Sequence, residues 1–305
     1  MKRAHIGVAA LVAFAYAGCF VAIKLGLPYA PPLRFAGLRA LLAGGVLIAV
    51  SGAAGRGLIP PLRLRPWVLV LGAVLAVQYA AMFLSLERAG AGLSSVLANT
   101  GPILLILLAA VFLEERITSI TAGAVLVGAA GVALIAWPRA GEATLGLVTV
   151  ALPLGVALGA AVETVLLKRL RVGSALMAVA GWQLLIGAVL LLGVSAVTEQ
   201  ARIVWTAELT AAVAFLAVPG TALGLGLWYW LVQREAVSRL AGFMFMVPVA
   251  GLLLAWAFFG ETVTAWGGVG LLLALGGIAL ASGLVPGFRE RAAAPATPPL
   301  PAGEE

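Results

Sequence analysis

Ten apolar stretches, each about as long as a bilayer is thick, account for most of this 305-residue chain. An α-helix needs about 20 apolar residues to cross roughly 30 Å of hydrocarbon. The stretches are bounded by charged residues, Pro or Trp, and cover approximately residues 6–25, 33–50, 67–86, 94–113, 119–137, 146–167, 175–197, 209–232, 240–259 and 263–283. Charged residues make up only 10% of the chain, too few to cover a soluble protein of this length. The sequence therefore predicts an all-α integral membrane protein with ten transmembrane helices.

The distribution of Lys and Arg between the loops indicates how these helices are oriented. If the N-terminus is cytoplasmic, thirteen Lys and Arg residues lie on the cytoplasmic side and five lie outside. Basic residues collect in cytoplasmic loops, so we expect both termini in the cytoplasm. Residues 284–305 are rich in Pro and poor in apolar residues, which predicts a disordered cytoplasmic tail.

An internal repeat organises the ten stretches. The segment 102–118 reappears as 248–264, with Pro, Leu-Leu-Ala, Phe, Glu and Thr at unchanged spacing. Matches such as Lys24 with Lys168 and Gly131 with Gly277 extend the repeat over the first five and last five stretches. Because five is odd, the second half enters the membrane from the opposite side, and two inverted-topology halves are typical of secondary transporters. The repeat also favours a retained first helix over the alternative, a cleaved secretory signal.

Several motifs resemble one transporter family. They are Phe20-Val21-Ala22-Ile23-Lys24, Ala36-Gly37-Leu38-Arg39, and Pro102 followed by Phe112-Leu113-Glu114-Glu115-Arg116. This pattern is similar to the EamA family of the drug/metabolite transporter superfamily, which commonly has Trp at the position of Tyr16 and a small residue at that of Glu114. The resemblance implies one EamA unit in residues 5–137 and a second in 146–283. It also implies a multi-pass protein of the cell inner (cytoplasmic) membrane that moves small metabolites.

Few polar residues interrupt the apolar stretches, and each needs a partner or a water-filled cavity. Counting 1.5 Å per residue places Gln78 and Tyr79 near mid-membrane, and Arg39 and Asn99 roughly 8–9 Å below the outer surface. We expect these four side chains to face one cavity. The hypothesis for substrate binding comprises Gln78, Tyr79, Asn99, Arg39, Glu163 and Tyr16.

Glu163 is the only acidic residue inside a predicted span, and Cys19 occupies its matching position in the first half. It either takes up a proton or binds a substrate amine, or it extends to the membrane surface and pairs with Lys168 or Arg169. Arg39, matched by Gln183, either binds a substrate carboxylate or hydrogen-bonds to carbonyls at a helix end. The estimated depths place Arg39 and Glu163 too far apart for a direct ion pair.

Corresponding proline-containing breaks interrupt the fourth and ninth stretches. Gly101-Pro102 and Pro248 mark them, and proline there frees the carbonyls of Ala98 and Met244. Paired breaks of this kind point to a transporter site or gate, with a packing kink as the alternative.

Glu115 and Glu261 form a repeated pair that we assign to structure. Each follows a span and precedes the next helix, where a carboxylate can accept hydrogen bonds from free backbone amides. Gly155 with Gly159, and Gly220 with Gly224, have the spacing of close helix contacts.

The sequence thus predicts a secondary transporter that exports small metabolites such as amino acids, aromatic or neutral ones among them, by alternating access. Efflux of multiple drugs or cationic compounds is the alternative. An intramembrane enzyme is disfavoured, because one buried acid with no buried His cannot supply a catalytic pair, and a channel is disfavoured because no repeated charge ring is visible. We expect a small-molecule substrate and the lipid bilayer as partners, with no catalytic residues, no cofactor, no metal and no nucleic acid. A monomer is expected, with a homodimer as the alternative.

Overall fold

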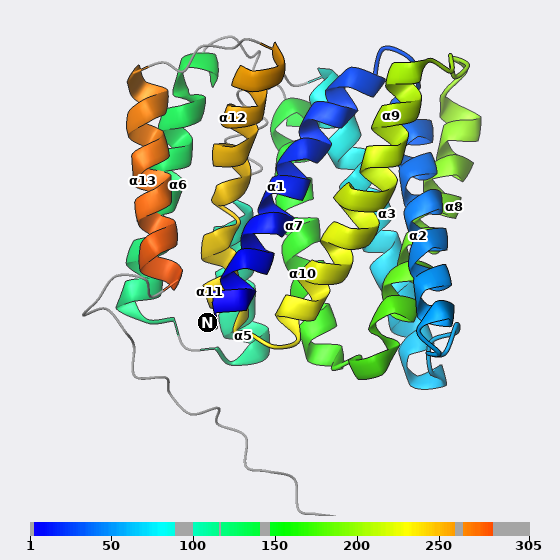
Figure 1. Ribbon diagram of the computed structural model, residues 1–305, viewed down its shortest axis with the longest axis horizontal. Helices are drawn as coiled ribbons and strands as arrows, with labels where there is room; N and C mark the ends of the chain where they lie inside the picture. Colours follow the sequence, from blue (N-terminus) through cyan, green and yellow to red (C-terminus); the bar gives the residue numbers. More distant parts are fainter. Residues whose placement is uncertain (1–2, 89–99, 116, 141–146, 260–264, 283–305) are drawn as a thin grey trace, which may run out of the picture.

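The computed structural model describes residues 3–88, 100–115, 117–140, 147–259 and 265–282, in which every regular element is helical (Figure 1). The first half contains α1 (Arg3–Gly26), α2 (Pro32–Ala53), η1 (Leu62–Leu64), α3 (Arg65–Arg88), α5 (Gly101–Leu113) and α6 (Ser119–Ala140). The second half contains α7 (Leu147–Leu170), η2 (Gly173–Ala175), α8 (Leu176–Thr198), α9 (Ala207–Phe215), η3 (Leu216–Leu223), α10 (Gly224–Val232), α11 (Val237–Phe243), α12 (Met246–Phe259) and α13 (Ala265–Ser282).

The described helices agree with a multi-span membrane protein. Six stretches are long and apolar enough to cross a bilayer: 4–26, 32–53, 62–87, 151–170, 173–198 and 207–232. Three shorter apolar helices cover 101–113, 119–134 and 265–277. The expected tail, 284–305, lies outside the described residues, and the count of ten transmembrane helices stays a prediction.

Helices that match in the repeat pack against each other. The two largest interfaces join α2 to α8 and α6 to α13, and each of these pairs has one helix from either half. Across the halves, α7 contacts α3 and α5, while its counterpart α1 contacts α10 and α12. The contacts of one half are therefore reproduced by the other, as a two-repeat fold requires.

Glutamates tie the two halves together at both ends. The Glu199 carboxylate, beyond the end of α8, accepts hydrogen bonds from the backbone N–H groups of Leu33 and Arg34, at 2.7 and 2.9 Å. These are unpaired amides in the first turn of α2, where a negative charge is favoured. Arg34 returns two bonds, to the carbonyls of Glu199 and Ala201. At the other end, the Glu115 carboxylate accepts hydrogen bonds from backbone N–H groups in the first turn of α11.

The matched glycines Gly131 and Gly277 both lie in the α6–α13 interface. A Cβ added at Gly277 would stand 2.7 Å from the Ala124 carbonyl oxygen and 2.7 Å from the Gly128 nitrogen. Backbone atoms cannot move aside as a flexible side chain can. The neighbouring Gly276 faces open space, with no atom within 4 Å of an added Cβ.

We therefore expect Gly277→Ala to destabilise the fold by about 1–3 kcal/mol, because α13 must move away from α6. Gly276→Ala adds the same methyl group to the same helix and is expected to leave stability unchanged or slightly raised. Thermal unfolding of the two variants in detergent measures the difference. Equal unfolding temperatures would contradict the close contact.

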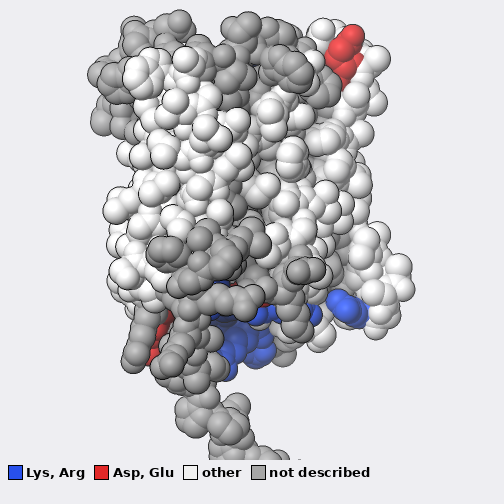
Figure 2. Space-filling model, turned by 60° about the vertical axis from the view of Figure 1, so that its left-hand side comes forward, with Lys and Arg blue, Asp and Glu red and all other residues white. Residues whose placement is uncertain are grey.

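Basic residues gather at one end of the face drawn in Figure 2. Lys and Arg side chains lie there at the lower end of the view, below a broad surface of uncharged residues. An uncharged belt bounded by charged residues is typical of a protein embedded in a bilayer.

Candidate substrate site

Arg39 is buried where α2 meets α1, α3 and η3, and only 3% of it is exposed. Its Nε donates a 2.6 Å hydrogen bond to the Thr221 hydroxyl, and its Nη2 lies 3.5 Å from the Cys19 sulfur. The guanidinium carbon stands 4.6 Å from the centre of the Tyr79 ring. In the described part of the chain, no carboxylate lies within ion-pair distance of it. We call Cys19, Arg39, Tyr79 and Thr221 the Arg39 cluster.

Glu163 forms a second buried group with residues of α8 and α10, and 5% of it is exposed. One carboxylate oxygen accepts hydrogen bonds from the Gln183 amide and from the Tyr229 hydroxyl. The same amide also donates to the Tyr229 hydroxyl, at 2.6 Å. Its carbonyl oxygen, Oε1 of Gln183, is buried without a partner. We call Glu163, Gln183 and Tyr229 the Glu163 cluster.

The two clusters use matching positions of the two halves. Cys19 corresponds to Glu163, and Arg39 corresponds to Gln183. In each half these two side chains contact each other across 20 residues of chain. The repeat is therefore preserved in position but not in charge, because the cation Arg39 matches the neutral Gln183 and the acid Glu163 matches the neutral Cys19.

The remaining predicted binding residues take different positions. Gln78 faces α7, where its Cβ would lie 3.0 Å from a Cβ added at Gly159, and its Oε1 is buried without a partner. Tyr16 packs on Gly224, at 3.1 Å from an added Cβ. Asn99 lies outside the described residues. The structure thus brings Arg39 and Tyr79 together, and it turns Gln78 toward the other half.

In the glycine pairs of the sixth and eighth spans, Gly159, Gly220 and Gly224 make close helix contacts, whereas Gly155 is at ordinary contact distance. Gly155 and Gly159 approach α3, whereas Gly220 and Gly224 approach α1. A Cβ at Gly220 would stand 2.6 Å from the Cys19 sulfur. These glycines therefore let the halves meet beside both clusters.

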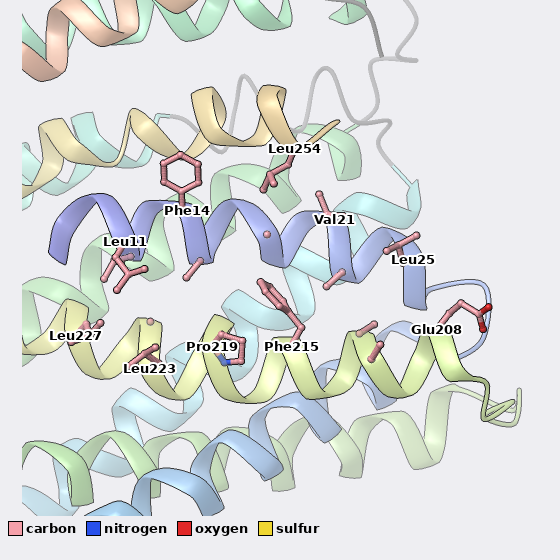
Figure 3. A pocket seen from close by; sticks show the side chains of 17 residues that line it. Leu11, Phe14, Val21, Leu25, Glu208, Phe215, Pro219, Leu223, Leu227 and Leu254 are labelled. Atoms are coloured by element: carbon pink, nitrogen blue, oxygen red, sulfur yellow. The ribbon is translucent and has the colours of Figure 1, made fainter. Parts of the chain in front are cut away.

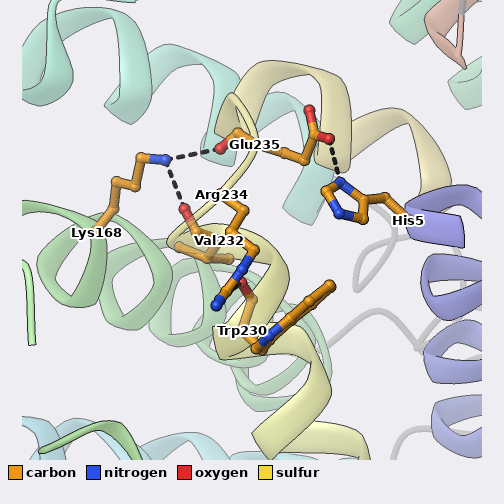
Figure 4. A network of polar contacts seen from close by, with 6 residues as sticks. All are labelled: His5, Lys168, Trp230, Val232, Arg234 and Glu235. Carbon is orange, nitrogen blue, oxygen red and sulfur yellow. Dashed lines mark hydrogen bonds and ion pairs between the residues drawn. The ribbon is translucent and has the colours of Figure 1, made fainter. Parts of the chain in front are cut away.

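The surface interpretation of Glu163 is wrong. Lys168 does not reach it and instead donates from Nζ to the carbonyls of Val232 and Glu235, at 2.6 and 2.7 Å (Figure 4). Carbonyls at a helix C-terminus attract an ammonium group, which accounts for the difference. Beside them, the Glu235 carboxylate pairs with His5 of α1.

The ninth stretch is divided into two helices near Pro248. The carbonyl that this proline was expected to leave free nevertheless has a hydrogen-bond partner. The chain turns between α11 and α12, and the Met244 carbonyl accepts a 3.0 Å bond from the Val247 N–H. A tighter turn thus satisfies the carbonyl that Pro248 leaves unpaired. Gly101 and Pro102 form the first turn of α5, a position that tolerates proline, and Ala98 lies outside the described part.

Sequence reasoning missed a second irregularity, in the eighth span. Residues 216–223 form a π-helix that contains Pro219. In this segment Thr221 accepts the hydrogen bond from Arg39, and Gly220 packs against Cys19. A Pro-Gly pair inside an apolar span was the available signal, because π-helical turns accompany proline and functional sites.

The Trp228-Tyr229-Trp230 segment lies near the end of the eighth span, but its first two side chains are buried inside the protein. Trp228 is buried and donates from Nε1 to the Thr164 hydroxyl at 3.2 Å, one residue beyond Glu163. Tyr229 is fully buried within the Glu163 cluster. Helices α10 and α7 face each other here, so the aromatic residues pack inside the protein.

An apolar groove of about 720 Å³ lies between α1 and the α9–η3–α10 helix (Figure 3). Leu11, Phe14, Phe215 and Leu223 are among its lining residues, and Glu208 is its only charged one. Tyr16 and Cys19 of the same α1 helix do not line it. Since the lining offers almost no hydrogen-bonding groups, we place the candidate site at the clusters and not in the groove.

Glu115 contacts the N-terminus of a helix, but not of the helix that follows it in sequence. Its carboxylate oxygens accept bonds from the backbone N–H groups of Val237 and Ser238, both at 2.9 Å. These belong to α11 of the other half, and not to the helix that follows Glu115 in sequence. Packing between the halves brings the N-terminus of α11 within hydrogen-bond distance of the Glu115 carboxylate. Glu261 lies outside the described residues.

Glu115→Ala is expected to destabilise the protein by about 1–2 kcal/mol, because the first turn of α11 loses its capping carboxylate. Glu114→Ala is the matched control, since Glu114 is exposed and adjacent. Thermal unfolding in detergent compares the two. An equal loss in both variants would show that the cap does not stabilise the junction of the halves.

Comparison with known proteins gives a consistent result. The profile of the EamA-like transporter family matches residues 4–137 and 147–283. The chain is 32% identical to the uncharacterized transporter YvbV of Bacillus subtilis (strain 168), over 84% of either chain. It is 28% identical to a probable amino-acid metabolite efflux pump of Salmonella typhimurium (strain LT2), over 95% of this chain and 98% of that protein. A crystal structure with 24% sequence identity superposes with a TM-score of 0.77, over 90% of this chain and 96% of the other.

Proposed function

Because the chain belongs to the EamA-like transporter family, we propose that it exports small metabolites such as amino acids across the cytoplasmic membrane by alternating access. The chain is a transporter and not an enzyme. Relatives named as amino-acid metabolite efflux pumps support the substrate class. We further propose two inverted EamA units, 5–137 and 146–283, with both termini in the cytoplasm, acting as a monomer.

One observation carries the proposal. Each buried polar cluster contains one pair of residues at matching positions of the two halves, Cys19 with Arg39 and Glu163 with Gln183, in the interior of an otherwise apolar helical protein. Buried polar groups in a membrane protein are costly and mark transport paths. A site formed by matching residues of two repeated halves is the arrangement that alternating access uses.

The contacts at the two ends of the protein fit the same mechanism. Glu199 joins the halves at one end, and Glu115 joins them at the other. Arg39 and Glu163 are nearly inaccessible, so a substrate reaches them only when one end opens. Release of one capping glutamate while the other holds would open the site to one side at a time.

Counterflow into proteoliposomes tests the proposal. Vesicles containing the purified protein and loaded with unlabelled amino acids should accumulate the labelled forms of L-leucine and L-phenylalanine. Gln78→Ala, Tyr79→Ala and Asn99→Ala are each expected to lower the rate about tenfold at unchanged expression, because each removes a hydrogen-bonding or aromatic contact. Val77→Ala, which changes an exposed neighbour on α3, should transport normally. Normal rates in all three site variants would show that the site lies elsewhere.

Efflux of organic cations is a second candidate, and one feature favours it. The Glu163 carboxylate accepts a hydrogen bond from Tyr229, and Trp228 contacts the adjacent Thr164, so that an acid and aromatic residues, which both attract cations, lie on neighbouring helices. Accumulation of a labelled lipophilic cation such as tetraphenylphosphonium, with no accumulation of amino acids, would establish this candidate in place of the first.

A further inference from the structure

The charge on Arg39 lacks a counter-charge. Its described partners are a hydroxyl, two sulfur atoms and an aromatic ring, all of them uncharged. An isolated charge inside a protein is costly unless it is paired. One guanidinium nitrogen, Nη1, has only the Met82 sulfur at 4.0 Å, a weak acceptor. The side chain thus keeps hydrogen-bonding capacity that suits an anionic oxygen.

The Glu163 cluster has the complementary deficiency. Its carboxylate is acceptor-only when ionised, and the buried oxygen of Gln183 has no donor. The buried oxygen of Gln78 on α3 likewise has no donor. A carboxylate with unpaired amide oxygens suits an ammonium group, which offers three donors and one positive charge.

The two clusters are close neighbours without being a pair. Arg39 and Glu163 form no ion pair with each other. Tyr79 of α3 stacks on Arg39, and the adjacent Gln78 packs against Gly159, one helical turn before Glu163 on α7. A small molecule that contacts this part of α3 therefore has a cation on one side and an acid on the other.

From this arrangement we infer that the site selects zwitterions, with the substrate carboxylate bound by Arg39 and its ammonium group bound by Glu163 and Gln183. The inference rests on the proposed function and adds the required charges and the orientation. Because the matching positions are Cys19 and Gln183, both uncharged, each half supplies one charge only. The substrate thus connects the two halves, which makes Arg39 and Glu163 determinants of specificity.

Analogues that lack one charge test the inference. In counterflow into proteoliposomes, L-leucine and L-phenylalanine are compared with their amides, which lack the carboxylate, and with 4-methylpentanoate and 3-phenylpropanoate, which lack the amine. The native protein should prefer the amino acids about 30-fold or more, because each analogue leaves a buried charge unpaired. Arg39→Gln should remove the preference for amino acids over the amides and keep the preference over the acids. Glu163→Gln should remove the preference over the acids and keep the preference over the amides.

Two exposed positions supply matched controls. Arg63→Gln and Glu208→Gln make the same chemical changes at the surface and should keep both preferences. Arg39→Lys restores the charge and should recover part of the preference over the amides, which a purely structural role of Arg39 would not produce. Exchange of amides and acids at the rate of the amino acids would overturn the inference alone. Exchange of none of the six compounds would overturn the proposed function together with it.

Discussion

An Arg39→Met variant is expected to unfold at a higher temperature than the native protein and to transport amino acids much more slowly. Arg39 is buried with only uncharged described partners, so its desolvation is not repaid by an opposite charge. Replacement of buried charges by apolar residues of similar volume often stabilises a protein, by about 1–4 kcal/mol. Met is similar in length to the aliphatic part of Arg and would adjoin Met82. The hydroxyl of Thr221 loses one donor, which is a smaller cost.

Thermal unfolding in detergent and counterflow in proteoliposomes measure the two effects on one preparation. Arg63→Met, at an exposed position, should change neither. An unfolding temperature several degrees below that of the native protein would show that Arg39 holds α2 to η3 through Thr221. Arg39 would then stabilise the fold, and the expectation that this residue lowers stability in exchange for transport would be wrong.

The sequence alone was enough for the architecture of the repeat. Apolar stretches of spanning length, with Pro, Glu and Thr kept in register, predict two halves with matching helices. The structure adds that matching helices pack against each other in the α2–α8 and α6–α13 interfaces, and Gly131 and Gly277 lie in the second of these. Such matches survive because a small residue at a close helix contact cannot be exchanged without moving backbone.

The composition of the site was less accessible to the sequence. Depth along a helix placed Gln78 and Tyr79 together, but neighbouring residues on a helix point about 100° apart. Tyr79 consequently stacks on Arg39, whereas Gln78 turns toward Gly159. Tyr229 was not among the predicted binding residues, since nothing local in the sequence reveals that α10 faces Glu163 of α7. Rotation about each helix axis is set by packing between helices, which a single sequence does not report.

Glu163→Gln is expected to abolish the effect of a pH gradient on export. In the native protein, the Glu163 carboxylate can hold either a proton or the substrate ammonium group, but not both. Protons entering from an acidic exterior therefore displace the substrate and drive it outward. The groups that face Glu163 are Gln183 and Tyr229 by hydrogen bonds, with Tyr16 and Tyr79 at longer range. None of these is a basic group that would carry the proton in its place.

Glutamine retains the size of Glu163 and a carbonyl oxygen that can accept from Gln183 and Tyr229, so the fold should be unaffected. Because the amide takes up no proton, an acidic exterior should no longer accelerate export. Exchange of labelled substrate at constant pH should continue at reduced affinity, since the amide oxygen still accepts a bond from an ammonium group. Glu208→Gln, at an exposed position, should respond to the gradient like the native protein. If the Glu163 variant keeps its full response, the proton is carried elsewhere, and the buried acid serves only to bind the substrate.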